Sequence, residues 1–142
     1  MDILNSLAKK LRLLELESPE TNAEGVQIVW QDQLINGTKN GLSLSLLPTA
    51  GGNVSFSIER ELSLPIQFTI ANYEQAKAFS DIWKIEEAFG MLPNNSDKFL
   101  PLSENGSYNF IKSETATSPQ QIEISEQDIY IYVLTVNFTI DK

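Results

Sequence analysis

The sequence predicts an α+β fold, in which a mainly antiparallel sheet of about five to six strands carries two helices packed on one face. Apolar residues recur at helical spacing in two segments, one near the N-terminus and one in the middle of the chain. Elsewhere, apolar and polar residues alternate in short runs separated by turn residues, which is typical of antiparallel strands. At 142 residues, the chain is expected to form a single domain, 1–142.

The composition restricts the chemistry that the protein can perform. The chain has no cysteine and no histidine, which excludes disulfides, thiolate zinc sites, cysteine nucleophiles and Ser-His-Asp triads. We therefore predict a protein that is not an enzyme, with no catalytic residue, no cofactor and no metal. The alternative is an enzyme that uses carboxylates, for which Glu59, Glu61 and Glu86 are the candidates.

The charge and the N-terminal sequence bear on partners and location. The formal net charge is −9, which disfavours binding to phosphate backbones. The chain begins Met1-Asp2, and Lys9-Lys10 interrupts the apolar positions, unlike a signal peptide. No stretch approaches the roughly 18 apolar residues of a membrane span. We expect a cytoplasmic protein with no membrane contact.

The first helix is predicted over residues 2–17, with Asp2 as its N-cap and Ser18-Pro19 as its end. Leu13 and Leu16 lie off its apolar stripe, near the C-terminal end. Either the domain itself covers this end on two sides, or the end contacts another subunit. The stripe consists of Ile3, Leu4, Leu7, Leu11 and Leu14.

Strands are predicted within 25–70, at Val26–Gln31, Leu42–Leu46, Val54–Ile58 and Leu64–Ile70. Pro65 has no N–H to donate, so we place it at a sheet edge or at the start of a strand. A flexible loop before the third strand is a candidate protein contact. Its candidate residues are Pro48, Thr49, Gly51 and Gly52.

The central helix is predicted over residues 73–91, with Asn72 and Gln75 in a capping-box arrangement and Gly90 near its end. It carries two apolar stripes, which together are wider than one sheet face requires. The second stripe is expected to lie under the first helix, or else against another subunit. Glu86, between the stripes, is expected at the rim of that contact or paired with a lysine. The first stripe is Ala78, Ile82, Ile85, Phe89 and Leu92; the second is Ala76 with the candidate contact residues Phe79 and Trp83.

The C-terminal third is predicted to hold strands at 107–112 and 129–140, joined by a polar loop. The loop, 113–121, is a candidate for disorder or for partner contact, the latter through Thr115, Thr117 and Pro119. The first half of the last strand is apolar on both faces. This pattern indicates a central strand, or one whose first half passes under a neighbouring subunit.

The order of elements, together with particular residues, resembles the tail-terminator and minor capsid (tail completion) proteins of long-tailed bacteriophages and prophages. The similarity covers nearly the whole chain. It rests on the N-terminal helix beginning Met1-Asp2-Ile3-Leu4, on Leu64-Pro65-Ile66-Gln67-Phe68 before a helix, on Leu100-Pro101-Leu102 followed by Gly106-Ser107-Tyr108-Asn109-Phe110, and on Tyr130-Ile131-Tyr132-Val133-Leu134.

This resemblance implies an architectural role. Tail terminators form rings, commonly hexamers, which cap the tail tube and join it to the head. The implied partners are further copies of the chain and the tail-tube and head-completion proteins, with no small-molecule substrate. DNA would pass through the ring without specific binding, and the location would be the virion, assembled in the host cytoplasm. The alternative is a cytoplasmic protein-binding or adaptor domain without catalysis.

Overall fold

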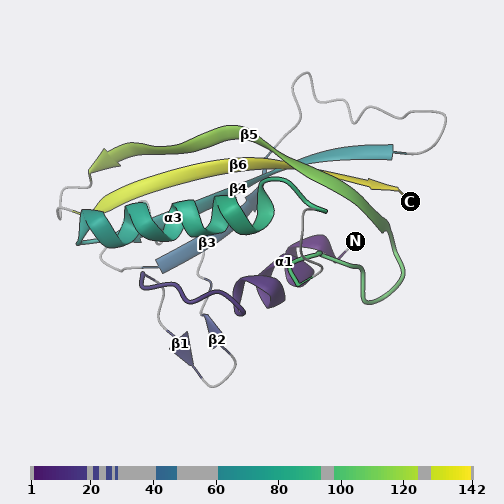
Figure 1. Ribbon diagram of the computed structural model, residues 1–142, viewed down its shortest axis with the longest axis horizontal. Coiled ribbons are helices and arrows are strands. Elements are labelled where there is room, and N and C mark those ends of the chain that lie inside the picture. The colour runs from purple at the N-terminus through teal and green to yellow at the C-terminus, as the bar shows by residue number, and fades with distance from the viewer. Residues whose placement is uncertain are drawn as a thin grey trace.

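A computed structural model describes residues 2–18, 21–22, 25–26, 28, 41–47, 61–93, 98–124 and 129–141. Within these ranges the protein has an α+β fold with one antiparallel sheet of four strands, in the order β3-β4-β6-β5, and two helices (Figure 1). The elements are α1 (Ile3–Leu11), β1 (Thr21–Asn22), β2 (Gly25–Val26), β3 (Gly41–Leu46), β4 (Glu61–Asn72), α3 (Gln75–Phe89), β5 (Asn109–Ile124) and β6 (Tyr130–Asp141).

The α+β class is confirmed, but the sheet has fewer strands than the five to six that we predicted. The segment predicted as the first strand contributes β2, which pairs with β1 in a separate two-stranded ribbon. Ile28 makes a single parallel bridge to Leu42 of β3. The predicted strand at 54–58 lies outside the described residues.

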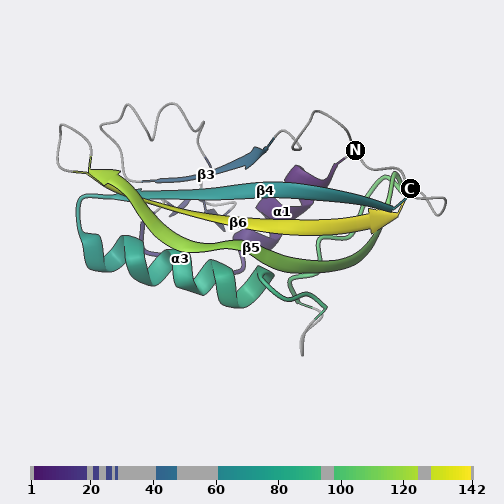
Figure 2. The ribbon, with the colours of Figure 1, turned by 90° about the horizontal axis from the view of Figure 1, so that it is seen from above.

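Both helices pack on the same apolar face of the sheet. The alternation in β4 and β6 turns every second side chain to this face, where Phe68 pairs with Leu134 across the two strands. Leu7 of α1 and Ile82 of α3 belong to the same buried cluster. Figure 2 shows α3 running along the sheet beside β5 and β6. The Phe68 ring stacks on Phe89 at a centroid distance of 5.8 Å, which joins α3 to the middle of the sheet.

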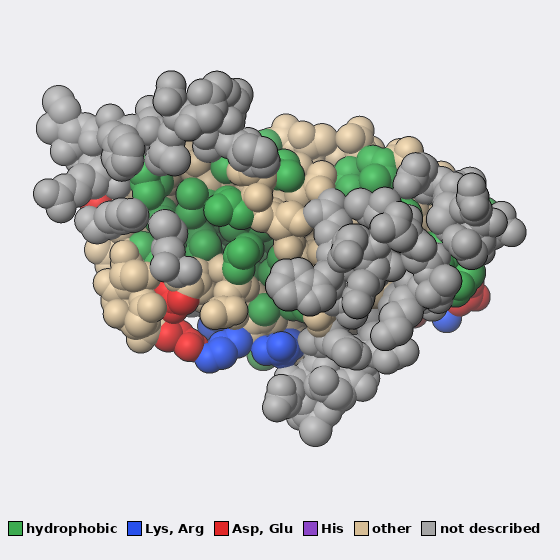
Figure 3. Space-filling model, turned by 180° about the vertical axis from the view of Figure 1, so that it is seen from behind, with side chains coloured by type: hydrophobic (Ala, Val, Ile, Leu, Met, Phe, Trp, Pro, Cys, Tyr) green, Lys and Arg blue, Asp and Glu red, His purple; other side chains and the backbone are tan. Residues whose placement is uncertain are grey.

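β6 is an inner strand, as its apolar first half indicated. It lies between β4 and β5. Ile131 and Val133 are buried on one face of the strand and Leu134 on the other. Figure 3 shows apolar side chains gathered on the side of the molecule opposite to the view of Figure 1, with charged side chains along the lower margin.

Pro65 lies in the interior of a central strand, contrary to our expectation of an edge or a strand start. It pairs with Asn137 of β6, and its carbonyl accepts a hydrogen bond from the Leu47 N–H at 2.8 Å. In an antiparallel sheet, the N–H and C=O of one residue point to the same neighbour. The missing N–H of Pro65 therefore faces the end of β3, where the ladder stops, and the pairing with β6 loses no bond.

The helix boundaries differ from the predicted 2–17 and 73–91. α1 ends at Leu11, after which the N–H groups of Leu13 and Leu14 bind carbonyls three residues earlier and the chain leaves the α-helical path. Further on, the backbone N–H groups of Glu17 and Ser18 bind the Asp81 carboxylate. α3 begins at Gln75, because Asn72 is the last residue of β4. The Asn72 Oδ1 accepts a hydrogen bond from the Glu74 N–H at 2.8 Å, which is a turn and not a helix cap.

The predicted strand 107–112 and polar loop 113–121 form one strand, β5, of 16 residues. Its hydroxyl and amide side chains suit an edge strand, because one side of such a strand remains in water. The pairing with β6 contains four register shifts. Pro119 falls within one of them, between Thr117 and Gln120, where a residue without an N–H costs little.

Candidate protein interface on helix α3

The two apolar stripes of α3 have different surroundings. Ala78, Ile82, Ile85 and Phe89 are fully buried against the sheet, as predicted. Phe79 and Trp83 are 51% and 38% exposed, so the expectation that the first helix covers them is wrong. α1 has only nine residues and contacts β3, at the other end of the strand order from β5.

The chain that follows α1 is tied to a different flank of α3. The buried carboxylate of Asp81 accepts the N–H of Glu17 at 2.9 Å and that of Ser18 at 2.5 Å. Residues two apart in a helix do not share a face, so Asp81 and Phe79 or Trp83 point to different sides. The segment after α1 therefore lies away from the two aromatic rings and leaves them in solvent.

The exposed rings are held in place by their neighbours. Phe79 lies 6.2 Å from Trp83 and 6.0 Å from Tyr132 of β6, the second pair in an edge-to-face arrangement. Gln75 donates from Nε2 to the Tyr132 hydroxyl at 3.2 Å and to Gln121 of β5 at 3.0 Å. We call Phe79 and Trp83 the aromatic flank of α3; it is an apolar surface on a rigid support.

The aromatic flank lies on the β5 side of α3. Glu86 is one turn from Trp83, and its Oε1 accepts a hydrogen bond from the Thr115 hydroxyl of β5 at 3.2 Å. The partner that the structure gives to Glu86 is thus Thr115 and not a lysine. Gly90 ends the helix in this region, and a Cβ on it would meet Thr115 Oγ1 at 2.5 Å.

The structure places the predicted contact residues in three groups. Phe79 and Trp83 are together on α3, and Thr115 is near them through Glu86. Thr117 is exposed and Pro119 is half-buried, and both belong to strand β5 and not to a loop. The four candidates of the loop before the third predicted strand, Pro48, Thr49, Gly51 and Gly52, lie outside the described residues.

In the described part of the chain, the carboxylates that were candidates for catalysis are not brought together in one site. Glu59 and the side chain of Glu61 lie outside the described part, and Glu86 binds Thr115. Within the ranges that are described, no group of three or more Asp or Glu side chains is placed to hold a metal ion.

Two polar anchors of the N-terminal segment were missed by sequence reasoning. Asp81 is fully buried, and its only sequence signal is its position beside the buried stripe of α3. Ser18, which Asp81 binds, also accepts a hydrogen bond from Asn72 Nδ2 at 3.1 Å. This anchor joins the end of the α1 segment to β4 and α3.

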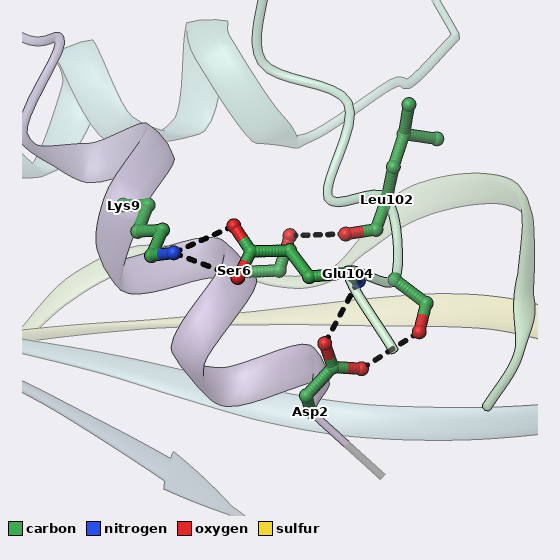
Figure 4. Close-up of polar contacts among 6 residues, drawn as sticks. Asp2, Ser6, Lys9, Leu102 and Glu104 are labelled. Carbon is green, nitrogen blue, oxygen red and sulfur yellow. Dashed lines mark hydrogen bonds and ion pairs between the residues drawn. The ribbon is translucent and has the colours of Figure 1, made fainter. Parts of the chain in front are cut away.

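The second anchor holds the start of α1 (Figure 4). Asp2 was predicted to cap α1, but its carboxylate instead accepts the Glu104 N–H and the Ser103 hydroxyl, each at 2.9 Å. The Glu104 N–H, first among these donors, holds the pKa of Asp2 below its usual value. Ser6 donates to the Leu102 carbonyl at 2.8 Å, and Lys9 forms an ion pair with Glu104 at 2.6 Å.

Tyr108 supports the same loop from within the core. Its hydroxyl donates to the Pro101 carbonyl at 2.5 Å, and the side chain is 3% exposed. Burial raises the pKa of the Tyr108 phenol to about 12. Both anchors act on the fold, whereas the aromatic flank places two exposed rings in contact with each other on one helix.

No model of a protein family matches the chain, and no curated protein matches its sequence. In the described part of the chain, no helix has both the length and the apolar character required to cross a membrane.

Proposed function

We propose that the protein is an architectural component of a bacteriophage or prophage tail, a tail terminator that assembles with itself and caps the tail tube at its junction with the head. The observation that carries the proposal is the aromatic flank: Phe79 and Trp83 are exposed on a helix whose other large apolar side chains, Ile82, Ile85 and Phe89, are fully buried.

Exposed aromatic residues on a rigid helix favour protein association. Each fully buried aromatic side chain removes roughly 150–250 Å² from water, at about 25 cal/mol per Å². Phe79 is already packed against Tyr132, so little side-chain freedom is lost when a partner covers it. Trp and Phe are also enriched at the centres of protein interfaces.

The phage assignment rests on the resemblance of the chain to tail terminators. The structural counterparts of the resembling residues are β4 leading into α3, the 101–107 loop anchored to α1, and β6 at the centre of the sheet. The net charge of −9 suits a ring through which DNA passes, because an anionic lumen does not retain phosphate groups. On this proposal the protein belongs to the virion.

The proposal is tested with tail-tube protein that polymerises in vitro. We expect the purified protein to form a discrete oligomer, alone or at tube ends, and to stop tube elongation at substoichiometric ratios. The variant Phe79→Ala/Trp83→Ala is expected to lose this activity. Leu102→Ala, which removes another exposed apolar side chain, serves as the matched control.

Two results would overturn the proposal. One is a monomer at all concentrations that leaves tube growth unchanged. The other is a stable complex of one copy with a single cytoplasmic protein and no affinity for tubes, which would identify an adaptor domain instead.

A further inference from the structure

A shallow apolar hollow lies on a second flank of α3. It has a volume of about 220 Å³ and is lined by Leu14, Lys84, Glu87, Ala88 and Phe99, which come from the segment after α1, from α3 and from the segment after α3. Leu14, Ala88 and Phe99 are only partly buried. We call this feature the apolar hollow.

The aromatic flank and the apolar hollow lie on different sides of one helix. Lys84 and Ala88 follow Phe79 and Trp83 by five residues each, which corresponds to a rotation of roughly 140° about the helix axis. The Lys84 ammonium donates to the Glu15 carbonyl at 3.0 Å, so this side faces the segment after α1. The aromatic flank faces β5. A single copy therefore cannot place its aromatic flank in its own hollow.

We propose that the aromatic flank of one copy packs into the apolar hollow of the next copy, and that this head-to-tail contact builds the ring. This inference rests on the proposed function and specifies its assembly contact. The occupant of the hollow is Trp83, with Phe79 beside it, from a second copy of the chain.

The chemistry of the hollow fits an aromatic ring. Three of its lining residues, Leu14, Ala88 and Phe99, are apolar, and two ammonium groups and the Glu87 carboxylate stand at or near it. Lys84 lines the hollow, and the Lys98 Nζ lies 5.4 Å from the centroid of the Phe99 ring. An ammonium group attracts the face of an indole or phenyl ring, most strongly that of Trp.

Charge favours the same pairing. Copies with a net charge of −9 repel one another, so a contact is most stable where one side is locally basic. The side of α3 with the hollow carries Lys84 and Glu87, with Lys98 nearby, whereas Glu86 accompanies the aromatic flank. Joining flank to hollow places Glu86 against two lysines and one glutamate, and joining two flanks would bring two Glu86 carboxylates together with no lysine between them.

A contact between two different patches has a structural consequence. Copies at the end of a growing chain retain one unused flank or one unused hollow, so association continues, and it ends in a ring when the rotation between neighbouring copies closes. A contact of one patch with itself would instead stop at a dimer. The proposal thus accounts for a ring, which a symmetric contact through Trp83 alone would not give.

The test mixes two full-length variants, each with one patch damaged. The flank variant is Phe79→Ala/Trp83→Ala, and the hollow variant is Ala88→Glu, which fills the hollow with a charged side chain that helices tolerate. Ala116→Glu makes the same change at an exposed position of β5 and is the control. Circular dichroism and thermal unfolding verify that each variant is folded.

Analytical ultracentrifugation gives the readout. We expect each damaged variant alone to self-associate at least about thirtyfold more weakly than wild type, as for a hot spot of about 2 kcal/mol. Mixed together they form a 1:1 heterodimer and no ring, because one intact flank meets one intact hollow. Ala116→Glu assembles as wild type does.

The failures of the two proposals are distinguishable. If wild type assembles and Ala88→Glu assembles equally well, the flank-to-hollow contact is wrong and the tail function stands. If the two folded variants do not combine when mixed, the contact is not head-to-tail and this inference is again overturned. If wild type assembles neither alone nor on tubes, the proposed function itself fails.

Discussion

The two apolar stripes of α3 have similar sequences and opposite surroundings. Ile82 and Phe89 face the sheet and are fully buried, whereas Phe79 and Trp83 face the β5 side and remain exposed. The first stripe is buried because it packs on the sheet, where Phe89 stacks on Phe68. The second stripe stays exposed because the segment after α1 is bound to Asp81 on another flank of the helix and does not cover it.

The largest effect is expected when one aromatic residue of each stripe is truncated and the losses of folding stability are compared. Phe89→Ala removes the ring that stacks on Phe68 and should lower the free energy of unfolding by about 3–5 kcal/mol. Phe79→Ala should lower that of the monomer by less than about 1 kcal/mol, because the ring is half exposed. Urea denaturation at low protein concentration measures both. Equal losses would show that the second stripe is also core.

Removal of the Asp81 carboxylate should have the next largest effect. Asp81→Ala leaves the buried N–H groups of Glu17 and Ser18 without their acceptor, and we expect a loss of about 2–4 kcal/mol. Asp81→Asn keeps one acceptor oxygen and should lose less. Protease cleavage after Lys9, Lys10 and Arg12 reports whether the segment has detached. Unchanged cleavage in Asp81→Ala would mean that the carboxylate does not hold this segment.

Crowding at Gly90 tests the contact between α3 and β5. A Cβ at this position would meet Thr115 Oγ1 at 2.5 Å and the Glu86 carbonyl at 2.6 Å, so Gly90→Ala should cost about 1–3 kcal/mol. The double variant Gly90→Ala/Thr115→Ser keeps the hydroxyl that the new Cβ would meet and removes only the methyl group of Thr115, so it is the control for the next variant. In Gly90→Ala/Thr115→Gly the nearest side-chain atom is absent, and part of the loss should be recovered. No recovery would place the strain elsewhere.

The smallest effect is confined to high pH. The pKa of Tyr108 is raised from 10 to about 12 in the folded protein, so the neutral phenol stabilises the fold. This contribution, roughly 2 kcal/mol, is complete below pH 10 and is lost as the pH rises to 12. Tyr108→Phe should remove that part of the pH dependence, as measured by urea denaturation at pH 9 and pH 11.5. An identical pH dependence in Tyr108→Phe would assign the effect to other groups.

The core was predictable because it follows from periodicity. Alternation in β4 and β6, and the spacing of Ala78, Ile82 and Phe89, each identify one buried face from the residues alone. The α+β class follows from the order of these patterns. The length of β5 was not predictable in the same way. Its hydroxyl-rich residues have no apolar alternation, and they form a strand because β6 beside them supplies the backbone partners.

The candidate site was predictable only in part. The second stripe of α3 is visible in the sequence, and Phe79 and Trp83 were identified from it. Whether α1 or solvent covers them depends on a contact between positions 17–18 and Asp81, which are more than sixty residues apart. No local pattern encodes such a contact. The apolar hollow likewise combines Leu14, Ala88 and Phe99 from three segments that only the fold brings together.

The central claim is that the surface around Trp83 is covered by a second copy of the chain. The chain has two tryptophans, so a Trp30→Phe variant with native circular dichroism makes Trp83 the sole indole fluorophore. We predict that its emission is that of a solvent-exposed indole in dilute solution. As sedimentation shows assembly at higher concentration, the emission should shift to shorter wavelength and become protected from acrylamide. Assembly without any change in Trp83 emission or quenching would contradict the account.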